Sequence, residues 1–111
     1  LIKLIPPITQ QMDQVLKNSP KNVSFWRSAI RTYFELASLD KIYTDKTLEA
    51  LERAIQLAPT DPKLYYNKAL ILDSEGKKEE SIQVLQKTLE LKPNYLEARQ
   101  QLEEATKSEG P

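Results

Sequence analysis

The chain contains neither cysteine nor histidine in its 111 residues, and this absence excludes several kinds of chemistry. It leaves no disulfide, no thiol nucleophile, no thiolate or imidazole metal ligand and no imidazole general base. Only two glycines occur, so a Gly-rich phosphate-binding loop is excluded as well. We therefore expect no catalytic residue, no cofactor and no metal, and we predict that the chain is not an enzyme.

The chain also lacks an excess of either charge and any long apolar run. Sixteen basic and sixteen acidic residues give a formal net charge of zero, which disfavours binding to nucleic acid or to an anionic membrane surface. No apolar stretch approaches the roughly 18 residues that a transmembrane helix needs. We expect neither a nucleic-acid partner nor membrane insertion by this segment. A cysteine-free domain is stable in any compartment, so the localisation stays open.

The chain does contain a repeated apolar phrase that ends in proline. Pro59 and Pro93 lie 34 residues apart, and the residues before them align. The aligned apolar positions are Leu48, Leu51, Ile55 and Leu57 in one copy and Ile82, Leu85, Leu89 and Leu91 in the other. A fixed period of this length is typical of helical repeat arrays. Pro20 ends a similar phrase, but 39 residues separate it from Pro59 because of an insertion around 39–44.

Local signals in the sequence predict six helices. Asp61 is a favourable N-cap, Pro62 suits a first helical position and Gly76 favours a turn, so we expect a helix over 61–75. A capping box at Asn94 and Glu97 is expected to open the last helix. The other helices are expected at about 8–20, 23–39, 45–58 and 78–91. Together they are expected to form a single domain over 1–111.

Residues 62–95 resemble one unit of the tetratricopeptide repeat family. Tyr65 stands at the aromatic position of the first helix, Ala69 at the small-residue position, Gly76 at the inter-helix turn and Pro93 at the terminal proline. The resemblance implies an all-α fold, a short right-handed superhelix of antiparallel helix hairpins. It divides the chain into a half repeat at 8–20, a repeat with an insertion at 23–61, a repeat at 62–95 and a capping helix at 96–108.

The resemblance also implies a function. Repeats of this family bind extended or helical peptides on a concave face lined by the first helix of each hairpin. We therefore expect a non-catalytic protein–protein interaction or scaffold module with a protein or peptide partner. The partner-binding residues carried over by position are Arg27, Arg31, Lys63, Tyr66, Asn67 and Leu70. The alternative for the two arginines is that they solubilise their helix or pair with Glu35. The large residues Trp26, Tyr33, Tyr65 and Leu85 are expected in the core.

Two further interpretations stay open at this point. The sequence of residues 20–100 is similar to the C-terminal repeat region of some bacterial membrane-embedded O-antigen polymerase or ligase-like proteins. That resemblance implies a structural appendage attached to a bacterial membrane protein. The third interpretation is self-association into a homodimer, with exposed apolar side chains near the start of the chain as the contact surface. Those side chains are Ile2, Leu4, Ile5 and Ile8.

Overall fold

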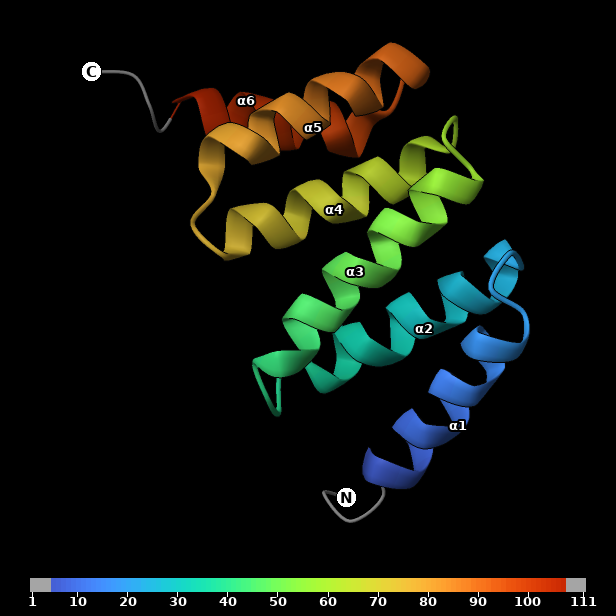
Figure 1. Cartoon of the computed structure of the whole chain (residues 1–111). Helices are drawn as coiled ribbons and strands as arrows, with labels where there is room; N and C mark the ends of the chain where they lie inside the picture. Colours follow the sequence, from blue (N-terminus) through green and yellow to red (C-terminus); the bar gives the residue numbers. More distant parts are fainter. Residues whose placement is uncertain (1–4, 108–111) are drawn as a thin grey trace. The chain divides into compact units, whose positions relative to one another are not determined.

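A computed structural model describes residues 5–107, with side chains from residue 9 onward. Within that range the chain forms six α-helices and no strand (Figure 1). The helices are α1 Ile5–Asn18, α2 Val23–Leu36, α3 Ile42–Leu57, α4 Pro62–Ser74, α5 Lys78–Leu91 and α6 Leu96–Lys107. None of them is both long and apolar enough to cross a membrane. The predicted all-α class is confirmed.

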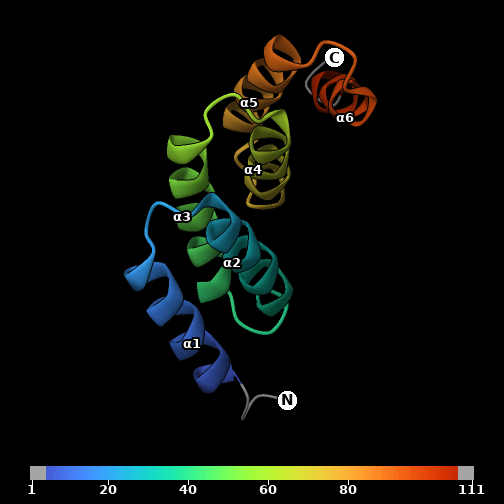
Figure 2. The same ribbon diagram turned by 90° about the vertical axis from the view of Figure 1, so that its right-hand side faces the viewer.

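The helices belong to two compact units, one ending at Pro59 and the other beginning at Thr60. In the first unit, α2 and α3 form an antiparallel hairpin, and α1 packs on α2 (Figure 2). Alanines at the helix contacts let the backbones approach closely, and larger side chains fill the remaining space. The buried apolar residues of this unit are Leu16, Ala29, Ile30, Tyr33, Ala50, Leu51 and Ala54.

The connection between α2 and α3 lies about three residues earlier in the chain than the sequence predicted, with the same length. Helix α2 ends at Leu36 rather than near residue 39, and α3 begins at Ile42 rather than near residue 45. The side chain of Asp40 accepts a hydrogen bond from the Ile42 amide at 3.1 Å, and its carbonyl accepts one from the Tyr43 amide at 3.1 Å. Because these bonds satisfy free amides at the helix start, part of the insertion joins α3 instead of forming a loop.

Local capping sets the limits of α4 in the second unit. Asp61 accepts a hydrogen bond from the Lys63 amide at 3.0 Å, and Pro62 occupies the first helical position. At the other end, Gly76 has a φ of 79°, and the Lys77 amide donates to the Leu72 carbonyl at 2.9 Å. This is the Schellman arrangement that a left-handed glycine permits. The predicted helices over 61–75 and 78–91 are confirmed, the first to within one residue at each end.

The core of the second unit lies where α4, α5 and α6 meet. Its centre is formed by Ala69, Leu85 and Ala98, each 0% exposed. Partly buried side chains surround this cluster: Tyr66, Val84, Leu89, Tyr95 and Leu102. Ser81, also fully buried, donates its hydroxyl to the Ala69 carbonyl at 2.8 Å. A buried hydroxyl is thereby satisfied at the contact between α4 and α5.

The start of α6 differs from the prediction. The helix begins at Leu96, and the Arg99 amide donates to the Tyr95 carbonyl at 3.1 Å. Within residues 9–107, the Asn94 side chain makes no hydrogen bond, so the predicted capping box is not formed. Tyr95 therefore stands at the helix entry, one residue later than the capping box requires, and its ring packs against the core cluster.

Candidate functional site

Four of the six predicted partner-binding residues lie on α4 in the second unit. Lys63, Tyr66, Asn67 and Leu70 follow the spacing i, i+3, i+4 and i+7, which places them on one face of a helix. Lys63 is exposed, and the other three are half-buried. We call these four residues the α4 face.

The polar side-chain groups of the α4 face are not bonded to other residues that the structure describes. In the part of the chain that the structure describes, the Lys63 ammonium, the Tyr66 hydroxyl and the Asn67 carboxamide make no hydrogen bond or ion pair. No described side-chain polar atom is both buried and without a hydrogen-bond partner, so these three groups must reach solvent. A carboxamide can donate and accept hydrogen bonds, and an ammonium carries three donors. The α4 face therefore offers both donors and acceptors to an incoming chain.

The tyrosine of the α4 face is held firmly by its neighbours. Its ring packs against the Ala69 cluster and lies 5.0 Å, between centroids, from the Tyr95 ring at an interplanar angle of 35°. Lys92 Nζ lies 5.0 Å from the centroid of Tyr95. Burial raises the pKa of the Tyr95 hydroxyl, and electrostatic interaction with the neighbouring Tyr66 raises it further. A packed ring with a free hydroxyl is a rigid contact that loses little conformational entropy on binding.

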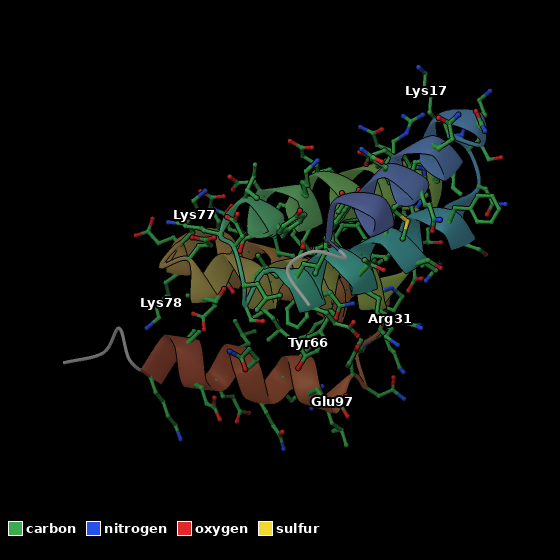
Figure 3. The ribbon with its side chains drawn as sticks, turned by 90° about the horizontal axis from the view of Figure 1, so that it is seen from below. Lys17, Arg31, Tyr66, Lys77, Lys78 and Glu97 are labelled. Carbon is green, nitrogen blue, oxygen red and sulfur yellow. The ribbon has the colours of Figure 1, made fainter. Side chains whose placement is uncertain are left out.

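Helix α6 adds an acidic group to the same unit. Glu97 is exposed in its first turn, and Figure 3 labels it together with Tyr66. The helix continues with Gln101, which is half-buried. The second unit thus presents the exposed cation of Lys63 on α4 and exposed acids on α6, of which Glu97 lies in the first turn.

The remaining two predicted residues, Arg27 and Arg31, lie four positions apart on α2 of the first unit. Arg27 is half-buried, whereas Arg31 is exposed (Figure 3). Among the described residues, the Arg31 guanidinium makes no ion pair, so the alternative in which it pairs with Glu35 is not seen. Phe34, three positions further on, is 59% exposed. A guanidinium and an aromatic ring are therefore both available on this helix.

Two of the four large residues expected in the core are buried, Tyr33 and Leu85, whereas Tyr65 and Trp26 are only half-buried. The Trp26 indole Nε1–H donates to the Pro20 carbonyl at 2.8 Å, and the ring lines an open cavity. Its helical position matches that of a core residue, so no signal in the sequence distinguishes the two cases. The described residues contain no group of three acidic, histidine or cysteine side chains that could hold a metal.

The family model described as tetratricopeptide repeat matches residues 62–95. None of the curated proteins compared with the chain matches it. Solved structures of MamA are similar to it. One has a TM-score of 0.62 at 23% identity and covers 89% of this chain and 75% of its own. A second, described as "MamA RS-1 ArsTM double mutant", has a TM-score of 0.72 at 25% identity.

That second alignment covers 97% of this chain, which spans only 61% of the other protein's length. A third MamA structure has a TM-score of 0.59 at 25% identity, covering 91% of this chain and 71% of its own. Residues 62–95 thus match the tetratricopeptide repeat model, and the helical fold of the chain is similar to that of MamA.

Proposed function

We propose that the chain is a non-catalytic protein-interaction module and that the α4 face binds an extended segment of a partner protein. The observation that carries this proposal is the set of three polar groups on one helix face with no partner inside the described structure. Polar groups of a folded protein are normally paired with one another or hydrated by water. Here an ammonium, a hydroxyl and a carboxamide lie together on one helix face, and the hydroxyl is carried by a rigid ring. A partner backbone can use the Asn67 carboxamide, and Leu70 supplies an apolar contact.

Arg31 and Phe34 on α2 support a role for the first unit in the same function. Arginine and aromatic residues are enriched among the residues that dominate binding energy at protein interfaces. We propose that Arg31, with its neighbour Arg27, contacts an acidic group of the partner. The exposed guanidinium can hold a carboxylate through two parallel hydrogen bonds.

Affinity capture from a lysate of the source cell tests the proposal. The full chain is compared with Lys63→Ala/Asn67→Ala, which removes two polar groups of the α4 face and leaves the packed Tyr66 ring in place. Gln86→Ala/Lys87→Ala, on exposed positions of α5, is the matched control. We expect a protein retained by the wild type and the control, with retention by the α4 variant reduced at least about tenfold, which corresponds to a loss of about 1.4 kcal/mol in binding free energy.

Equal retention by all three proteins would exclude the α4 face as the binding surface. A separate Arg31→Glu variant then tests α2, since reversing the charge should abolish binding of an acidic segment. Circular dichroism confirms that each variant keeps its helices, so that loss of binding is not loss of folding.

The second candidate is a structural appendage of a membrane-embedded O-antigen polymerase or ligase-like protein. It rests on the sequence similarity of residues 20–100 alone. The coding sequence upstream of Leu1 tests it, because such a parent should encode several apolar spans. Self-association is the third. Its predicted contacts Ile2 and Leu4 lie outside the described residues, as do the side chains of Ile5 and Ile8. Light scattering on the purified chain tests for a dimer.

A further inference from the structure

The first unit contains an open cavity bordered by all three of its helices. Its volume is about 200 Å³. Asp13 lines it from α1, Trp26 and Tyr33 from α2, and Lys46 and Glu49 from α3. It is smaller than the roughly 300–1,000 Å³ pockets that enclose drug-sized ligands. The space suits one long side chain rather than a free organic cofactor.

Two carboxylates on different helices border this cavity. Tyr33 donates its hydroxyl to Asp13 Oδ1 at 2.9 Å, which orients the carboxylate and leaves its second oxygen unused by this bond. Glu49 has no hydrogen bond or ion pair with any other residue that the structure describes. Burial raises the pKa of the Tyr33 hydroxyl above its ordinary value, and the charges of Asp13 and Glu49 raise it further. The tyrosine therefore experiences the negative potential of both acids.

Among the described side chains, the only basic group that lines the cavity is Lys46, and it does not pair with these acids. Lys46 makes no ion pair within residues 9–107; instead its Nζ lies 5.7 Å from the centroid of the Tyr33 ring. A cation is thus already accommodated beside an aromatic ring at this place. With two carboxylates and one ammonium, the lining carries a formal charge of −1.

The aromatic walls are fixed by their own contacts. The Trp26 indole is tied to the Pro20 carbonyl, and the Tyr33 ring stacks with Tyr43 at a centroid separation of 6.2 Å. Rigid aromatic rings beside carboxylates that form no ion pair with a described residue make a site for a cation that carries both charge and a flat apolar surface. Among side chains, the guanidinium of arginine has this combination. Lysine has a compact and more strongly hydrated charge.

We propose that this cavity binds an arginine side chain presented by a protein partner. The guanidinium donates to Asp13 and Glu49 and lies beside the aromatic rings, and its arrival displaces Lys46 from the neighbourhood of Tyr33. The inference concerns the first unit and does not depend on the α4 face. It adds a second contact point, selective for a basic residue of the partner.

The test uses the full chain and the short peptide acetyl-Gly-Arg-Gly-amide as a probe. Trp26 is the only tryptophan, so a nitrogen–proton correlation spectrum contains a single indole signal, located at the cavity. We expect the arginine peptide to shift this signal saturably. The same peptide with lysine should bind several-fold more weakly, and the same peptide with glutamate should leave the signal unchanged. Equal binding of the arginine and glutamate peptides, or no saturable shift with arginine, would overturn the proposal.

Three variants test which groups bind the probe. Asp13→Asn/Glu49→Gln removes both charges while an asparagine oxygen can still accept from Tyr33, and we expect it to weaken binding at least about tenfold, as loss of charge-assisted bonds does. Glu35→Gln, an exposed acid of the same unit outside the cavity, is the control and should bind like wild type. Lys46→Gln should bind more tightly, because the competing cation is gone.

The Lys46 variant keeps the test decisive if the double variant is unstable. If the acids have only a structural role, Lys46→Gln should not increase the affinity for the arginine peptide. If Lys46 competes with the peptide for the same site, the affinity should rise. Unchanged or weaker binding by Lys46→Gln contradicts the proposed site. Equal affinity for the lysine and arginine peptides overturns the assignment to arginine.

Discussion

Truncation of Leu85 to alanine should reveal how far the second unit depends on its small central cluster. Leu85 is 0% exposed and packs with Ala69 and Ala98, whose side chains are too short to fill the space that the missing Cγ, Cδ1 and Cδ2 atoms would leave. Leucine-to-alanine changes at fully buried sites cost about 2–5 kcal/mol, depending on how far the site collapses. The surrounding tyrosine rings are rigid, so little collapse is expected and the cost should lie in the upper half of that range.

The magnitude is large relative to the stability of a domain of this size. Single domains are stable by about 5–15 kcal/mol, so Leu85→Ala should remove a substantial fraction. At 111 residues, each kcal/mol corresponds to a fall of roughly 4 °C in Tm. Urea unfolding followed by far-ultraviolet circular dichroism measures the change, and an unaltered m-value would show that the loss is one of stability.

Matched variants make this prediction refutable. Leu96→Ala removes the same atoms from a side chain that is 64% exposed in the same unit, and it should change stability by less than about 0.5 kcal/mol. Leu85→Val should fall between the two, at about 1 kcal/mol. If Leu85→Ala costs less than about 1 kcal/mol, or no more than Leu96→Ala, the cluster is not the core of this unit.

Three further predictions concern single groups. Gly76→Ala should destabilise by about 1 kcal/mol in thermal unfolding, since its φ is 79° although an added Cβ meets no atom within 4 Å; a neutral result would show that the left-handed turn is not required. Asp61→Ala should cost about 1 kcal/mol by removing the cap on the Lys63 amide, whereas Asp61→Asn should cost less. The pKa of the Tyr33 hydroxyl is higher in the folded protein than in the unfolded chain. The contribution of this group to the free energy of unfolding is therefore complete below about pH 10 and is lost as the pH rises further, because the unfolded chain releases its proton first. Tyr33→Phe should therefore show a shallower loss of stability above that pH, and parallel curves for the two proteins would contradict this reasoning.

The helix boundaries show where prediction from sequence succeeded. Asp61, Pro62 and Gly76 act through bonds to residues within one turn, so α4 could be placed before any packing was known. The insertion between α2 and α3 was misjudged because two competing local signals exist there. Asp40 can lie within a loop or bond to the start of a helix, and in the structure its side chain accepts from the Ile42 amide at the start of α3.

The candidate site was predictable only as a set of helix positions. The register placed Lys63, Tyr66, Asn67 and Leu70 on one face, and the structure has them there. Their role as a binding surface stays a proposal. Whether each polar group is used internally depends on side chains distant in sequence, such as Tyr95, which packs on Tyr66. A helical pattern carries no information about those partners.

By itself, the sequence determined the all-α class, the repeat period and most helix limits, because these depend on hydrophobic spacing and caps within a few residues. Tertiary structure alone decided that Trp26 lines a cavity, that Asp13 and Glu49 border the same space, and that Arg31 is unpaired among the described residues. The cavity arises where α1, α2 and α3 meet, and its two acids, Asp13 and Glu49, are 36 positions apart in the sequence. The free energy of such contacts depends on three-dimensional distance, which a periodic sequence does not encode.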